Sequence, residues 1–192
     1  MRKILSPKFF DRPAPRVARE LLGKFLVRKR GIYETAYMIT EVEAYTGKDD
    51  TSSHAANGKT ERNKVMFGPA GHWYVYFIYG MYHCLNIVTE KDGEAGAVLI
   101  RSVMIPLKQH SHILKNVRML QGKKITGPGR VCRALGVDTR FYGKPANKKT
   151  GLWIEDRKFS VKNLKLEIKK TSRVNVGGDT KAKKRLWRFV LA

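Results

Sequence analysis

The sequence predicts an α+β fold: a single domain, residues 1–192, with a mainly antiparallel, curved β-sheet flanked by helices. The chain has 192 residues, 42% of them hydrophobic, which is enough for one core of its own. Segments with strand character outnumber those with helical periodicity, and several follow one another with only a turn between them. The sequence contains neither an internal repeat nor a convincing domain linker.

The first half of the chain is expected to hold a helix, strands and a long polar loop. Val17 and Leu21 repeat at helical spacing, so a helix begins after Pro15 and ends at Gly23. Strands are expected at residues 24–29, 37–45 and 72–79, and the loop, TGKDDTSSHAANGKTERNK, at residues 46–64. A polar loop of this length inside a compact domain is usually functional.

The second half is expected to continue with a hairpin, helices and closing strands. NIVT at 86–89 and AVLIRSV at 97–103 flank a turn, which predicts the hairpin. GPGRVCRALGV, residues 127–137, opens on Gly-Pro-Gly and carries Val131 and Leu135 at helical spacing. A candidate helix at 111–121 lies within the basic segment 104–126, and closing strands are expected at 152–156, 164–170 and 186–190.

The charge of the chain predicts a polyanionic partner. Lys and Arg number 39 against 16 Asp and Glu, which gives a net charge of +23 and favours a nucleic acid backbone. A membrane surface is the rival, but no amphipathic helix has one basic face and no apolar run could span a bilayer. Because Pro7 and Lys8 interrupt the apolar start, we expect no signal peptide. We therefore expect an intracellular location with the genome.

Cysteine and histidine patterns predict no metal site, and we expect no cofactor. Cys84 and Cys132 are too few and too far apart for a disulfide framework or a zinc cluster, and no histidine has metal spacing with them. His110 and His112 form a His-x-His pair, but within a basic segment expected at the surface.

The strand 37–45 carries two carboxylates and a phenol. In a regular strand alternate side chains share a face. Such a face is either a solvated sheet surface or, beside a long polar loop, part of a site. The expected faces are Met38, Thr40, Val42 and Ala44 on one side, and Ile39, Glu41, Glu43 and Tyr45 on the other.

The stretch YVYFIYGMYHCLN, residues 74–86, is rich in tyrosine. A tyrosine ring can stack on a nucleobase, whereas a buried hydroxyl needs a hydrogen-bond partner. Gly80 allows a sharp turn that would place Tyr79 or Met81 at a tip, where a side chain can wedge into a base stack. A tyrosine-rich core strand is the alternative.

Several other polar residues could be structural or could contact a ligand. The start of the helix at Gly129 and Arg130 could hold a phosphate on free N–H groups, or be a helix start alone. His54 could be an ordinary surface residue. Thr60, Arg62 and Asn63 could cap, turn or bind phosphate, and Asp49 and Asp50 are expected to be turn or cap residues.

Taken together, colinear segments covering most of the chain are similar to one known family. They are FFDRPAPRVARELLGKFLV, ITEVEAYTG, SSHAANGKTERNKVMF, YVYFIYGMYHCLNIV, AVLIRSV, ITGPGRVCRALGV, and the closing RV and WRF. The chain resembles the alkyladenine-type 3-methyladenine DNA glycosylases, which excise damaged purines. The order of EVEAY before YVYFIYGMYHCLN is highly specific.

The resemblance implies roles for the matched residues. Glu43 matches the carboxylate that activates the attacking water, and Arg101 matches an arginine that helps hold Glu43 and the water. Tyr45 and Tyr76 match the rings that sandwich the flipped base, and His54 matches the residue that packs against it.

Further matches lie around the base pocket. Asn86 matches the residue that disfavours ordinary guanine, and Tyr79 matches the wedge, which Met81 and Tyr82 support. Among the polar residues we assign contacts with the DNA backbone to Thr60, Arg62, Asn63, Gly129 and Arg130.

The resemblance implies a monofunctional glycosylase. It would flip alkylated purines out of double-stranded DNA and hydrolyse the N-glycosidic bond, leaving an abasic site without strand cleavage and initiating base excision repair. Activity on hypoxanthine or ethenoadenine stays open. We expect a monomer whose partner is damaged duplex DNA, with no membrane association.

Two other interpretations stay open. A non-catalytic module binding tRNA, the ribosome or DNA on the same scaffold fits the basic composition, but gives no reason for Glu43 and Tyr45 to share a face. An inactive glycosylase would bind lesions without excising them. The chain departs from the family pattern in having no acidic residue soon after Arg101, and in Asn175 where glycine is common.

Overall fold

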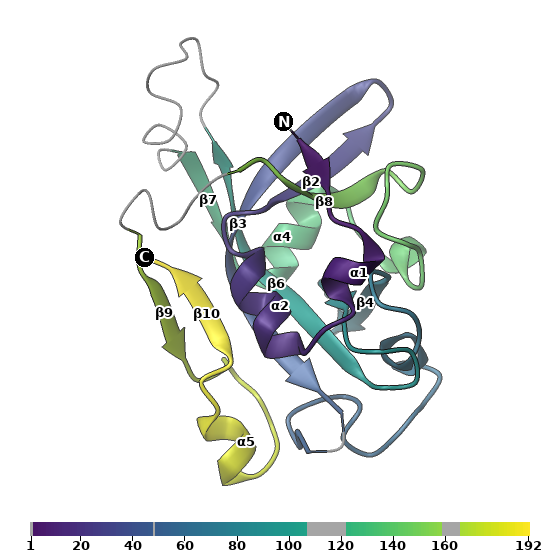
Figure 1. Ribbon diagram of the computed structural model, residues 1–192, viewed down its shortest axis with the longest axis vertical. Coiled ribbons are helices and arrows are strands. Elements are labelled where there is room, and N and C mark those ends of the chain that lie inside the picture. Colours follow the sequence, from purple (N-terminus) through teal and green to yellow (C-terminus); the bar gives the residue numbers. More distant parts are fainter. Residues whose placement is uncertain (1, 48, 107–121, 159–165) are drawn as a thin grey trace.

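The strands of the protein form one antiparallel sheet in the computed structural model, which describes residues 2–47, 49–106, 122–158 and 166–192 (Figure 1). Its main path is β1 (Lys3–Ile4), β8 (Leu152–Asp156), β2 (Phe25–Arg30), β3 (Tyr33–Thr46), β6 (Gly96–Pro106), β5 (Tyr82–Val88) and β4 (Trp73–Ile78). Off this path, β7 (Gly122–Thr126) pairs with β6, and β10 (Arg188–Leu191) pairs with β3 and with β9 (Ile168–Thr171).

The helices in the described part of the chain are few and short, which confirms the predicted α+β class. They are α1 (Pro7–Phe10), α2 (Ala14–Leu21), α4 (Pro128–Leu135) and α5 (Thr180–Lys184), with 3-10 turns η1 (Lys64–Phe67) and η2 (Thr139–Phe141). Apolar residues of α2 and α4 share one buried cluster with the inner faces of β3, β5 and β6. None of the described helices is long and apolar enough to cross a membrane.

Two helices, α2 and α4, form where the apolar periodicity of the sequence predicts them. Val17 and Leu21 of α2, and Val131 and Leu135 of α4, are completely buried, because the i, i+4 spacing puts each pair on one face. The helix α4 ends at Gly136, whose φ of 55° is left-handed. The candidate helix at 111–121 and the histidine pair at 110–112 lie outside the described residues.

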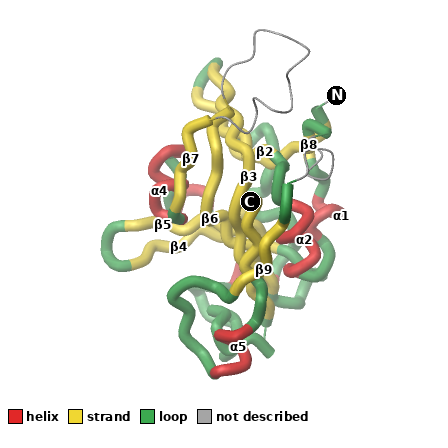
Figure 2. The backbone as a smooth tube through the Cα atoms, turned by 90° about the vertical axis from the view of Figure 1, so that its left-hand side faces the viewer, coloured by secondary structure: helices red, strands yellow, loops and turns green. Residues whose placement is uncertain are grey.

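Two hairpins carry the tyrosine stretch and the strand after it. The expected hairpin at 86–103 is confirmed, since β5 and β6 pair antiparallel. The expected turn at Gly80 is confirmed as well: β4 and β5 pair with Ile78 opposite Tyr82, and in Figure 2 their loop projects from the body of the molecule.

The closing strands differ in extent from the prediction. The strand at 152–156 is confirmed as β8, while β9 and β10 begin later than expected, and the chain between 159 and 165 lies outside the described residues. β7 was not predicted, because GKKIT has exposed lysines and no apolar alternation to mark a strand.

A β-bulge in β3 changes which side chains share a face. The register with β6 shifts on both sides of Glu41, so Thr40 has no partner across the ladder. Ile39 therefore packs in the main core with Val42, while Met38 packs in a separate cluster. The predicted faces were wrong at these positions, because one extra residue in a strand inverts the alternation.

The bulge leaves the carboxylates on the predicted common face, but that face is not solvated. Glu41 and Glu43 are both buried, so the interpretation of this strand as a solvated sheet surface is wrong.

Candidate active site

A cavity of about 690 Å³ opens between the sheet, the start of α4 and two loop segments. It is of the size that holds small organic ligands in proteins. Its walls come from β3 to β6, from residues 51–54, from residues 126–130 and from residues 174–177. Predicted site residues that line it are Tyr45, His54, Tyr76, Tyr79, Tyr82, Asn86, Arg101, Gly129 and Arg130.

Glu43 lies directly behind the wall of this cavity. Its Oε1 accepts a 2.8 Å hydrogen bond from the backbone N–H of Val174. Its Oε2 accepts hydrogen bonds from the Tyr45 hydroxyl, at 2.8 Å, and from Arg101 Nη1, at 3.4 Å. All three donors belong to residues that line the cavity, so the carboxylate is fixed against it by three partners.

Arg101 is held between two carboxylates of β3. Its Nε donates to Glu41 Oε1 at 3.1 Å, while Nη1 reaches Glu43. Glu41 also accepts hydrogen bonds from Ser102 at 2.6 Å and from Arg188 at 2.7 Å. Burial alone would raise the pKa of Glu41, but the hydrogen bonds from Ser102 and Arg188 and the neighbouring arginine charges leave it lowered. Glu41 is therefore an anion that orients Arg101.

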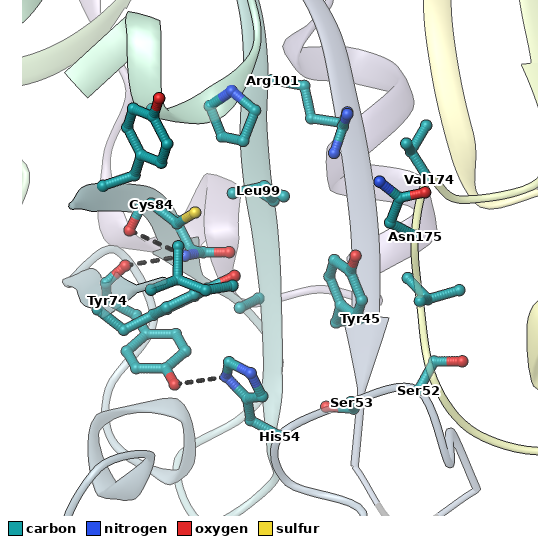
Figure 3. Close-up of a pocket in the computed structure, with 18 of the residues that line it drawn as sticks. Tyr45, Ser52, Ser53, His54, Tyr74, Cys84, Leu99, Arg101, Val174 and Asn175 are labelled. Carbon is teal, nitrogen blue, oxygen red and sulfur yellow. Dashed lines mark hydrogen bonds between the residues drawn. The ribbon is translucent and has the colours of Figure 1, made fainter. Parts of the chain in front are cut away.

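The tyrosine stretch forms an aromatic wall around His54. The His54 Nδ1 and the Tyr74 hydroxyl lie 2.8 Å apart in a hydrogen bond (Figure 3). The Tyr76 ring meets His54 edge-on, with centroids 4.7 Å apart, and lies 5.2 Å from the Tyr74 ring. Tyr74 and Tyr76 both line the cavity, and Tyr74 is the more deeply buried of the two, with its hydroxyl bonded to His54.

Burial sets the protonation of this wall. It raises the pKa of Tyr74 and Tyr76, so both phenols are neutral. Burial, aided by the charge of Arg62, lowers the pKa of His54, so its imidazole is neutral at pH 7. In Figure 3, Tyr45 lies on β3 across the cavity from Tyr74, with His54 between them.

The loop between β4 and β5 presents large apolar side chains to solvent. Tyr79 and Gly80 have left-handed φ values of 54° and 66°, and the Met81 N–H donates to the Ile78 carbonyl, which closes a type I′ turn. Tyr79 is 74% exposed and Met81 62%. A left-handed conformation is strained for a tyrosine, and such strain is concentrated at functional sites.

A family model described as "Methylpurine-DNA glycosylase (MPG)" matches residues 8–192. The chain belongs to the methylpurine-DNA glycosylase family. A protein of Alkaliphilus oremlandii is 41% identical over 196 residues, covering 97% of this chain and 95% of the relative. A protein of Methanocella arvoryzae is 45% identical over 156 residues, covering 80% and 77%. Both bear the name "Putative 3-methyladenine DNA glycosylase". The resemblance stated above is thereby confirmed, and the family is one of DNA repair.

Not every predicted residue of this glycosylase faces the cavity or solvent. Asn63 is only 1% exposed. Its amide donates to the carbonyls of His54 and Gly58 and accepts from the N–H of Thr60. A phosphate cannot reach an amide so placed, and Asn63 instead fastens the loop that carries His54. Arg62 is exposed and lies over the Tyr76 ring, 5.3 Å from its centroid.

Asn86 and Tyr82 are fixed by close contacts. The Asn86 amide nitrogen donates to the backbone carbonyls of Tyr74 and Cys84, which sets the plane of the side chain at the cavity. Tyr82 packs on the first turn of α4, where a Cβ at Gly129 would lie 2.7 Å from its ring. Gly129 therefore allows the base of the exposed loop to rest on α4.

Sequence reasoning missed several residues of the site of this glycosylase. Val174 contacts Glu43 through its backbone, which no side-chain pattern reveals. Asp50 was expected to be a turn or cap residue. It does bond the Thr46 N–H, but it is completely buried in an ion pair with Arg173. Asn175, at the departure from the family pattern, lines the cavity with a left-handed φ of 52°, which asparagine tolerates better than most residues.

No group of three or more His, Cys, Asp or Glu among the described residues is arranged to hold a metal ion. We therefore assign no residue of this part of the chain as a metal ligand.

Proposed function

We propose that this methylpurine-DNA glycosylase excises alkylated purines of the 3-methyladenine type from duplex DNA by hydrolysing the N-glycosidic bond. The observation that carries the proposal is Glu43, which is held at the wall of a cavity with room for a purine base by Val174, Tyr45 and Arg101. A buried carboxylate so fixed has no evident structural use there, because hydrophobic residues would fill the space at lower cost in desolvation.

The exposed turn supplies a means to reach the base. A base inside a duplex must be extruded before a hydrolytic site can act on it, at a cost of roughly a few kcal/mol. Tyr79 stands at the tip of the β4–β5 hairpin with Met81 beside it. Inserted into the duplex, the Tyr79 ring would fill the gap left by the base and offset part of this cost.

The cavity suits a flat, cationic base. Tyr45 and Tyr76 offer ring faces, and both phenols stay neutral because burial raises their pKa. A cation stacked on such faces is attracted by the ring quadrupole, which favours alkylated purines over ordinary ones. The neutral His54 adds no opposing charge.

The Glu43 carboxylate, which Arg101 helps to hold, is suited to the hydrolytic step. As the N-glycosidic bond breaks, the sugar gains oxocarbenium character and the electron pair leaves with the base. Glu43 stabilises the positive charge on the sugar. It also accepts a proton from the attacking water while the water oxygen bonds to C1′. A cationic alkylated purine leaves as a neutral base and needs no proton donor.

The product is proposed to be an abasic site in an intact strand. Strand cleavage by a lyase requires an amine that forms a Schiff base with the sugar. The described residues that line the cavity include Arg101 and Arg130 but no lysine. The net charge of +23 supports binding to the DNA backbone, with affinity that falls steeply as salt rises.

The test is an analysis of both products. Methylated duplex DNA is incubated with the protein, released bases are separated by chromatography, and strands are sized before and after alkali. The proposal predicts free 3-methyladenine and breaks that appear only after alkali. Breaks before alkali would contradict hydrolysis without lyase activity. Tight DNA binding with no released base would contradict excision and favour a binding module.

A further inference from the structure

A buried ion pair lies directly behind the site. Arg173 Nη1 and Nη2 donate to the two carboxylate oxygens of Asp50, at 2.6 and 2.7 Å. Neither side chain has any solvent exposure. The pair joins the polar loop after β3 to the segment before α5, two parts of the chain that are far apart in sequence.

The same guanidinium also binds two backbone carbonyls. Nη1 donates to Ala44 of β3 and Nη2 to Ala182 of α5, each at 3.0 Å. Asp50 in turn accepts a hydrogen bond from the backbone N–H of Thr46, at the end of β3. One ion pair therefore ties together β3, the loop and the segment near the C-terminus.

The pair contacts the site through two neighbours. Val174 follows Arg173 directly, and its N–H is the donor to Glu43 Oε1. The Tyr45 ring lies over the guanidinium, with its centroid 4.7 Å from Cζ, while Trp187 lies 5.4 Å away. Arg173 thus packs against the Tyr45 ring. It also fixes the position of the Val174 backbone N–H, which donates to Glu43.

Neighbouring contacts fasten the same two segments. The Ser52 hydroxyl donates to the Gly177 carbonyl at 2.6 Å, and the Asp179 N–H donates to Thr51 Oγ1 at 2.9 Å. A Cβ at Gly178 would lie 2.7 Å from Thr51, so the segments are in close contact. Both segments form walls of the cavity.

Stability alone is a poor reason for this pair. Burying two charges costs desolvation energy, and a hydrophobic replacement of similar volume is often equally stable. Within the described part of the chain, Arg173 Nε is buried without a hydrogen-bond partner, which is a further cost. A role in positioning Glu43 and Tyr45 would explain why this costly ion pair is buried here.

We propose that Arg173 and Asp50 are positioning residues for hydrolysis. They do not touch the substrate. They hold the Val174 N–H and the Tyr45 ring in the places that fix the Glu43 carboxylate against the cavity. This inference rests on the proposed glycosylase function, since it assigns the pair to the step that Glu43 performs.

The test is the variant Asp50→Asn, with Asp156→Asn, from a partly exposed ion pair, as a control for the loss of an ion pair remote from the cavity. Asp156 makes a 2.7 Å ion pair with Lys24 and does not line the cavity. Single-turnover excision and the Kd for lesion DNA are measured where circular dichroism shows each variant folded. Asp50→Asn is expected to slow excision by about 10- to 100-fold with little change in Kd, as for a misplaced catalytic group. Asp156→Asn is expected to leave the rate unchanged.

A second variant, Arg173→Lys, covers the case in which Asp50→Asn does not fold. Lysine keeps the positive charge but lacks the planar guanidinium that binds both oxygens of Asp50. Excision by Arg173→Lys is therefore expected to be slower than excision by the wild type. Full activity of the folded variant would overturn the inference, and so would equal slowing by Asp50→Asn and Asp156→Asn. Absence of excision by the wild type would contradict both the proposed function and this inference. If the wild type is active and Asp50→Asn is equally active, only this inference is contradicted.

Discussion

The Tyr45 hydroxyl donates a 2.8 Å hydrogen bond to Oε2 of Glu43, so the cavity-lining ring and the buried carboxylate act as one unit. Both side chains project from the same face of β3, beyond the bulge at Thr40. Burial, and then the Glu43 carboxylate beside it, raise the pKa of Tyr45, so the phenol remains a protonated donor at every pH at which the protein is assayed.

Tyr45→Phe separates the two roles of this residue. The ring stays, but Glu43 loses one of its three donors. A hydrogen bond to a charged group contributes about 1.5–3 kcal/mol, so excision is expected to slow by about 10- to 100-fold. Lesion binding is expected to persist, because the stacking face remains. Single-turnover rates beside Kd values check this, and an unchanged rate would show that Glu43 does not depend on Tyr45.

The strained backbone of Tyr79 can be tested for a role in excision. Glycine adopts φ of 54° freely, so Tyr79→Gly is expected to stabilise the free protein by about 1 kcal/mol while it lowers excision from duplex DNA. Tyr79→Ala is the matched control, because it removes the ring but keeps a Cβ at the strained position. Thermal unfolding and base release measure the two effects. A drop in stability for Tyr79→Gly would contradict the argument from strain.

Glu41→Gln is expected to destabilise the fold by about 3 kcal/mol, because it removes the buried anion that pairs with Arg188 and leaves Arg101 with Glu43 alone. The measurement is urea unfolding. Glu61→Gln is the control, since Glu61 pairs with Lys64 on the surface and its removal is expected to have no measurable effect. Equal stability of Glu41→Gln and wild type would mean that Glu41 is not the anchor of Arg101.

His54 predicts a pH dependence of stability. Its folded pKa lies below the usual 6.5 because of burial, with Arg62 adding to the effect. The unfolded chain therefore binds the proton at higher pH, and stability is lost as pH falls below about 6.5. His54→Gln is expected to lose less stability than the wild type between pH of about 7.5 and 5.5. An equal loss in the free energy of unfolding for the two proteins between these pH values would contradict this prediction.

Local patterns in the sequence predicted much of the site. Period-two alternation placed Glu43 and Tyr45 together, Gly80 predicted the tip that carries Tyr79, and helical spacing located α2 and α4. These features succeed because each depends on neighbours a few residues away along the chain.

Other features depend on which segments meet, and these could not be predicted. The bulge at Thr40 exists only in the register of β3 with β6, so the faces of Met38 and Ile39 were inverted. The Asp50 and Arg173 pair joins distant segments, and although Arg173 lies in one of the family-like segments, nothing in the sequence indicates that it meets Asp50. The donor from Val174 is a backbone group, which any residue type would supply.

The most direct test of the central claim is Glu43→Gln beside the wild type, in single-turnover release of 3-methyladenine from methylated duplex DNA. Lesion-DNA affinity is measured in the same samples. Glutamine keeps the size of the side chain but cannot take a proton from water. We predict release by the wild type, loss of release by Glu43→Gln, and similar DNA affinity for both. Equal release by both proteins would contradict the assignment of water activation to Glu43.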